Sequence, residues 1–145
     1  MNKPAIVTGR QPPAVQEDPS ALSRTEKMWG LVDLAIVGLG AAIRNSPVLA
    51  SEIDPKLIVQ FLHMETVGDV LARFFDSKGK ISNSGSETLI TGMNIASLMK
   101  IENVVCLSGG KKKIKGIAAA AASGFINILV TDSWSAQKIL EMADI

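Results

Sequence analysis

The chain has few of the side chains that build metal and redox sites. Its 145 residues include one cysteine, Cys106, and one histidine, His63. One thiol and one imidazole cannot fill a typical zinc site, and a single cysteine has no partner for an intramolecular disulfide. Because Cys106 lies in the apolar run 104–107, we expect it to be a buried core residue and not a nucleophile. The sequence therefore predicts no metal site and no cofactor.

The chain also lacks an excess of charge and a long hydrophobic run. Lysine and arginine number 15 against 14 aspartates and glutamates, which leaves a net charge of +1. Such a chain has no strong positive field, so we expect no direct contact with nucleic acid. No apolar run reaches the roughly 20 residues that cross a bilayer, and the N-terminus lacks the apolar core of a signal peptide. We therefore expect a cytoplasmic protein that does not bind a membrane.

The length and the hydrophobic share of 47% suit one domain with a core of its own. Residues 1–18 contain three prolines and a glycine, which favour an extended arm or linker over a helix. Residues 19–145 are expected to form the domain. Strand patterns alternate there with helix patterns, which predicts an α/β fold with a mostly parallel sheet and helices on both faces. The predicted strands are 34–37, 104–107 and 126–130, and the predicted helices are 20–31, 55–65, 94–99, 112–122 and 133–143.

Two local patterns refine this expectation. The strand 34–37 is continuously apolar, as is typical of a central parallel strand that is covered on both faces, and we expect it to end in a glycine loop at 38–40. Residues 69–75 and the segment from Lys80 onward flank the polar stretch 76–79, which ends in a glycine. This arrangement predicts a β-hairpin that reverses at 76–79.

A run of lysines stands where a helix is expected to begin. Lys111, Lys112 and Lys113 follow Gly109 and Gly110, between the predicted strand 104–107 and the alanine-rich helix. Cations at a helix N-terminus are unfavourable, because the unpaired N–H groups there already carry partial positive charge. Glycines, exposed amides and ammonium groups together form a receptor for an anion such as phosphate. The alternative is that the lysines are solvated surface charges.

Among these lysines, Lys113 is the better candidate for a ligand contact. At 100° per residue the alanine-rich helix directs Lys112 away from its buried side and places Lys113 on a flank. A surface lysine whose aliphatic stem packs on the protein fits the same position equally well. The residues expected on the buried side of this helix are Ile114, Ile117, Ala118 and Ala121.

Other candidates follow or enter the predicted strands, where open parallel sheets bind their ligands. Gly38 and Gly40 either admit a ligand close to the backbone or only permit a turn. Asp69 could accept hydrogen bonds from sugar hydroxyls, although a turn or capping carboxylate is the more frequent role. Arg44 is either a second anion clamp or a solvated loop residue. We expect Asp132 to cap the helix that follows it.

Four motifs occur in a fixed order along the chain. Residues 33–40 read DLAIVGLG, residues 67–79 contain VGDV and RFFD followed by a glycine, residues 109–113 read GGKKK, and residues 129–132 read LVTD. In order and spacing they resemble the effector-binding domain of SorC-type bacterial regulators of transcription. These sugar-responsive proteins are often grouped with deoxyribonucleoside regulators of the DeoR type.

The resemblance implies a fold like that of sugar-phosphate isomerases and deaminases, with a phosphorylated sugar held over the strand ends. On that basis Asp69 would bind sugar hydroxyls, Lys113 would bind the phosphate or another polar group, and Gly38 and Gly40 would line the pocket. Nothing in the chain resembles the family's helix-turn-helix or its early glycine- and threonine-rich loop. The chain therefore looks like the second half of a regulator.

The leading hypothesis is a module of a homo-oligomer that binds a phosphorylated sugar and controls DNA binding by a helix-turn-helix domain absent from this chain. A sugar-phosphate isomerase or deaminase is the first alternative. It is less favoured because residues 41–43, just after Gly40, carry no ionisable group that could serve as a general base. The second alternative is an oligomerisation fragment in which four aromatic residues anchor the interface, namely Trp29, Phe74, Phe75 and Trp134.

Overall fold

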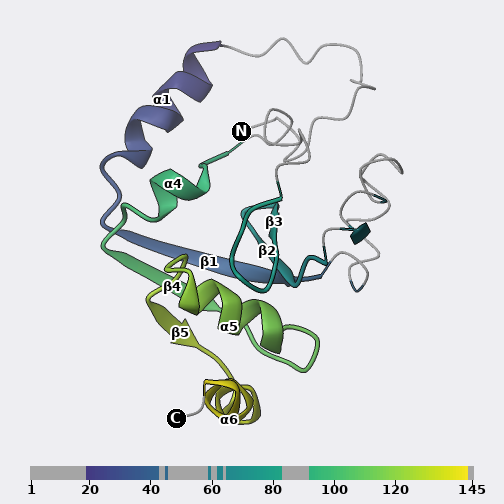
Figure 1. Cartoon of the computed structure of the whole chain (residues 1–145). Helices are drawn as coiled ribbons and strands as arrows, with labels where there is room; N and C mark the ends of the chain where they lie inside the picture. Colours follow the sequence, from purple (N-terminus) through teal and green to yellow (C-terminus); the bar gives the residue numbers. More distant parts are fainter. Residues whose placement is uncertain are drawn as a thin grey trace.

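The structure is a computed structural model that describes residues 19–42, 65–82 and 92–143 and the single positions 45, 59, 62 and 63. The predicted arm 1–18, Arg44 and most of the predicted helix 55–65 lie outside these residues. The elements in chain order are α1 (Pro19–Trp29), β1 (Leu34–Ala41), β2 (Gly68–Val70), β3 (Arg73–Phe75), α4 (Ile95–Leu98), β4 (Asn103–Leu107), α5 (Ile114–Ala122), β5 (Ile128–Val130) and α6 (Ser133–Met142). The strands form one five-stranded sheet in the order β3-β2-β1-β4-β5 (Figure 1).

The sheet is mixed. β1 pairs with β4 and β4 pairs with β5 in parallel, and the βαβ unit predicted at the C-terminal end is confirmed. β2 pairs with β1 and β3 pairs with β2 in antiparallel fashion. The prediction of an α/β fold is confirmed, whereas the prediction of a mostly parallel sheet is not confirmed. The reason is that the hairpin extends the same sheet beyond β1 and contributes half of the strand pairings.

The hairpin reverses earlier than the sequence indicates. Leu71 and Ala72, between β2 and β3, have φ angles of 52° and 60°, so both residues of this turn are left-handed. Such two-residue turns match the twist of a hairpin but usually contain glycine or asparagine, which explains why the turn was missed. The predicted reversal also exists, because the Gly79 N–H donates to the Asp76 carbonyl at 3.0 Å and the Asp76 N–H donates to Lys80.

β1 continues through its two glycines. Gly38 is paired with Leu107 of β4, and Gly40 is paired with Asp69 of β2. The expectation of a glycine loop at 38–40 is therefore wrong. The backbone stays extended because β4 flanks the first part of β1 and the hairpin flanks its last part.

Helix α5 covers one face of the sheet and is packed closely on it (Figure 1). Its buried residues are Ile114, Gly116, Ile117, Ala119 and Ala120, whereas Ala121 is exposed. The predicted buried side is thus partly wrong, because the helix is rotated so that Gly116 faces the sheet. A Cβ at Gly116 would lie 2.9 Å from the carbonyl oxygen of Val67. The absence of a side chain at this position allows the backbone of α5 to approach the start of β2.

The face of β1, β4 and β5 that points away from α5 is exposed in this chain. The exposed fraction is 65% for Ile36 in β1, 52% for Leu107 in β4 and 51% for Val130 in β5. Val37 and Leu39, which point to the α5 side, are only 7% and 2% exposed. Parallel strands are usually covered on both faces, so the prediction that the strand 34–37 is buried from both sides is wrong for this chain.

We predict that replacing Gly116 by valine destabilises the protein, because the added Cβ alone would lie 2.9 Å from the carbonyl oxygen of Val67 and 3.1 Å from the side chain of Leu39, and valine adds two methyl groups beyond it. The cost should be about 2 kcal/mol or more, as expected for overpacking of a close contact. Ala121→Val on the exposed side of the same helix is the control and should cost less than about 1 kcal/mol. Denaturant unfolding of both variants measures the difference. Equal stabilities would contradict the close packing at Gly116.

Candidate functional site

A buried carboxylate lies beside the end of β1. Asp69 pairs with Gly40, and a Cβ on Gly40 would overlap with Oδ1 of Asp69. The aspartate is only 8% exposed, and its Oδ1 accepts no hydrogen bond within the described part of the chain. Buried polar atoms nearly always have a partner, so this oxygen is one of few buried side-chain atoms in the described residues without one. The glycine provides the room for that carboxylate.

The charge state of this carboxylate is unusual. Burial raises the pKa of Asp69 to about 6, against smaller lowering effects from the backbone N–H of Ala72 and the positive charge of Lys113. The charge of Lys113 also lowers the pKa of Cys106, although burial of this thiol raises it more. Lys113 therefore acts electrostatically on both β2 and β4. The structure places Asp69 against Gly40 and within electrostatic reach of Lys113.

The other predicted glycines have different surroundings. A Cβ on Gly38 would meet no atom within 4 Å, so this position borders open space on the face of the sheet that carries Asp69. Gly110 has a φ angle of 94° and open space beside it as well. Arg44, the second predicted anion clamp, lies outside the described residues.

The expected anion cradle of exposed amides at the Gly109–Gly110 turn is occupied by the protein itself. The Gly110 N–H donates to Oγ of Ser135 at 2.8 Å and to Oδ2 of Asp132 at 3.2 Å. Asp132 caps α6 by accepting from the Ser135 N–H, as predicted, and hydrogen bonds from Ser135 and Gly110 hold its pKa below the usual range. The prediction of free amides at this turn is thus wrong for the Gly110 N–H, because Ser135 and Asp132 accept its hydrogen.

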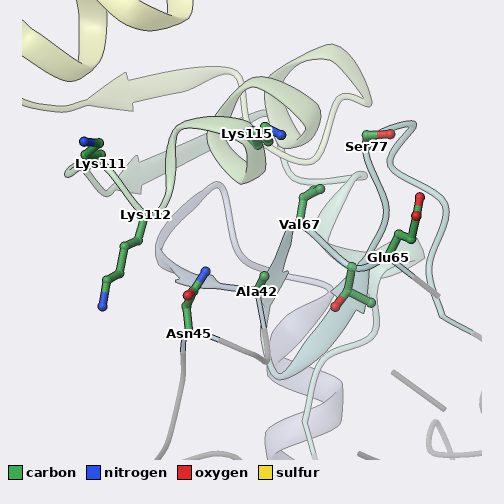
Figure 2. Close-up of a pocket in the computed structure, with 9 residues that line it drawn as sticks. Ala42, Asn45, Glu65, Val67, Ser77, Lys111, Lys112 and Lys115 are labelled. Carbon is green, nitrogen blue, oxygen red and sulfur yellow. The ribbon is translucent and has the colours of Figure 1, made fainter. Parts of the chain in front are cut away.

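A cavity of about 500 Å³ lies next to this turn and carries the lysine charges (Figure 2). In Figure 2 the lysines lie to the left and top of the opening, and Glu65 and Ser77 lie to the right. Lys113 does not line this cavity. The prediction that Lys113 is the better candidate for a ligand contact than Lys111 and Lys112 therefore does not apply to it. No periodic signal in the sequence indicates this grouping, because Lys111 and Lys112 lie in the turn before α5 and only Lys115 lies on the helix. The polar residues around the cavity are Asn45, Glu65, Thr66, Ser77, Lys111, Lys112 and Lys115.

Within the described ranges, no group of three or more His, Cys, Asp or Glu side chains could hold a metal ion. None of the helices described here is long and apolar enough to span a bilayer. Phe74 and Phe75, two of the four aromatic residues considered as interface anchors, are 3% and 0% exposed. They are core residues and are not available to a partner.

Comparison with known proteins identifies the family. Residues 2–141 match the model of a family described as a sugar-binding domain. The chain belongs to this family. The transcriptional regulator LsrR of Escherichia coli strain K12 is 35% identical over 112 residues, which are 74% of this chain and 35% of that regulator. The deoxyribonucleoside regulator of Bacillus subtilis strain 168 is 30% identical over 79 residues, which are 54% of this chain and 25% of that protein. The chain thus spans about a third or less of the length of these curated relatives.

Solved structures agree with this assignment. A DeoR family transcriptional regulator from Listeria monocytogenes is 27% identical, with a TM-score of 0.76 over 85% of this chain and 50% of its own. The sorbitol operon regulator SorC from Klebsiella pneumoniae shares the fold with a TM-score of 0.73, over 86% of this chain and 40% of its own. The predicted membership of the SorC-type sugar-binding regulators is therefore confirmed.

The raised pKa of Asp69 predicts a pH-dependent stability. The folded state binds the proton more tightly than the unfolded state, in which the pKa is near 3.8, so the stabilising contribution is complete below that value and is lost as the pH rises through about 6. Relative to Asp69→Asn, the free energy of unfolding of the wild type should fall by roughly 2.4 kcal/mol between about pH 4 and about pH 7. Urea unfolding of both proteins across this range measures the effect. If the free energy of unfolding changes equally with pH in the wild type and in Asp69→Asn, the pKa of Asp69 is not raised in the folded protein.

Proposed function

We propose that this chain is the effector-binding part of a sugar-responsive regulator of transcription and that its effector is a phosphorylated sugar. The observation that carries the proposal is the buried oxygen of Asp69 that lacks a hydrogen-bond donor, in a domain of the sugar-binding family. Support for the phosphate comes from the lysine-lined cavity beside it. Sugar and phosphate recognition would thus use different side chains of neighbouring elements.

The sugar would bind through its hydroxyl groups. A hydroxyl that donates to Oδ1 of Asp69 provides the missing hydrogen bond, and bonds to a charged acceptor are roughly twice as strong as neutral ones. Because burial disfavours the carboxylate in the free protein, a donor from the sugar would also recover part of that desolvation cost. The positive charge of Lys113 favours the same ionised form. Asp69 would therefore contribute both affinity and selectivity for polyhydroxylated ligands.

Binding would reach the DNA through a change in population. An effector that binds one conformation or oligomeric state better than another shifts the equilibrium between them by its difference in affinity. The DNA-binding domain would lie outside this chain, and the regulator would act in the cytoplasm as a homo-oligomer. We propose binding without turnover, in keeping with the relatives named above, which are regulators of transcription.

Isothermal titration with a panel of phosphorylated sugars, each beside its unphosphorylated counterpart, tests the proposal. At least one phosphorylated sugar should release or absorb heat with the wild type. Asp69→Asn should weaken that binding about tenfold or more. The amide NH2 group of asparagine cannot accept a hydrogen bond, so the sugar hydroxyl would be left as an unpaired donor in a buried site, at a cost of at least roughly 1.4 kcal/mol. If a folded sample gives no heat with any member of the panel, the chain is not a sugar sensor.

A further inference from the structure

The cavity beside α5 has an unbalanced charge. Lys111, Lys112 and Lys115 line it together with a single carboxylate, that of Glu65. None of the three ammonium groups forms an ion pair with a carboxylate in the part of the chain that the structure describes. Three like charges around one opening repel each other, so the site is poised to bind an anion that would neutralise them.

The remaining walls of this cavity suit a small, highly charged anion with hydrogen-bond acceptors. Ser77 and Asn45 contribute a hydroxyl and an amide, both of which can donate hydrogen bonds (Figure 2). Thr66, which is only 6% exposed, adds a second hydroxyl from within the protein. Phosphate has the oxygen acceptors and the charge that three lysines and these donors match. A nucleic acid is a poorer fit, because the whole chain carries a net charge of only +1.

The position of the cavity relates it to the proposed sugar contact. Val67 lines the cavity and lies two residues before Asp69 on the segment that leads into β2. Two residues of extended chain span roughly 7 Å, so one wall of the cavity is separated from Asp69 by about that length of backbone. The alternative phosphate site at the Gly109–Gly110 turn is blocked, because Asp132 and Ser135 already accept the hydrogen of the Gly110 N–H.

We propose that Lys111, Lys112 and Lys115 form the oxyanion subsite of this domain and bind the phosphate of the effector, whereas Asp69 binds its hydroxyls. This inference rests on the proposed function but assigns the phosphate to lysines other than Lys113. The charge of Lys113 instead favours the ionised form of Asp69. Selectivity for phosphorylated over plain sugars would then reside in three lysines and not in the glycine turn.

The subsite can be tested with inorganic phosphate alone. Phosphate is added to the wild type at constant ionic strength. The NMR signals of the ε-methylene groups of Lys111, Lys112 and Lys115 should shift and then saturate as the phosphate concentration rises. The triple variant Lys111→Gln, Lys112→Gln, Lys115→Gln should lose at least about tenfold in phosphate affinity. The matched control is a second triple variant with the same change of net charge, Arg24→Gln, Lys27→Gln, Lys100→Gln, at exposed positions outside the cavity lining.

The control variant should keep the wild-type affinity within about twofold, because distant exposed charges are screened by salt. Equal losses in both triple variants, or unsaturable shifts spread over all lysines, would overturn the subsite. The outcome is independent of the sugar titrations. Sugar binding that persists with an unchanged preference for phosphorylated ligands in the cavity variant would refute the phosphate assignment and leave the sugar sensor intact. Absence of any sugar binding, with saturable phosphate binding, would refute the sensor and leave the anion site.

Discussion

The contact between the Asp69 carboxylate and the backbone of Gly40 is the constraint on which the site depends. It exists because β2 pairs antiparallel with the last residues of β1, so that a carboxylate and a glycine become direct neighbours on one face of the sheet. Any larger residue at position 40 would displace the carboxylate. Beside Gly40 the aspartate is buried, has one oxygen without a partner among the described residues and has a pKa of about 6. The proposed role of Asp69 as an acceptor for a ligand depends on this state.

The cations around this carboxylate have divided roles. Lys113 is half-buried at the start of α5 and acts on Asp69 and Cys106 through its charge. Lys111, Lys112 and Lys115 surround an open cavity instead. Of these four lysines only Lys115 lies on α5, whereas Lys111, Lys112 and Lys113 belong to the turn that leads into the helix.

Local rules predicted much of the fold. The caps formed by Asn94 and Asp132 follow from side chains that accept from N–H groups three residues later, and both are present. The glycine that ends α5, Gly124, has the positive φ expected of a helix stop. The βαβ unit of β4, α5 and β5 follows from periodicity alone. Order and spacing of the motifs identified the family, which no single motif would have done.

Properties that depend on distant partners could not be predicted from the sequence. The left-handed turn at Leu71 and Ala72 is imposed by the strands on either side, since neither residue favours that conformation. The occupation of the Gly110 amide by Asp132 and Ser135 joins residues that are more than 20 positions apart. The exposed face of β1, β4 and β5 could not be predicted from periodicity either. An apolar strand has the same sequence pattern whether or not a layer of helices covers it.

The most direct measurement is an NMR titration of the Asp69 side-chain carboxyl, in the free protein and with a saturating phosphorylated sugar. In the free protein the carboxyl should titrate near pH 6. With the sugar bound, its pKa should fall, because hydroxyl donors stabilise the ionised form. A carboxyl that titrates at the ordinary value in the free protein, or whose pKa is unchanged by a sugar that binds, would contradict the role of Asp69 at the centre of this site.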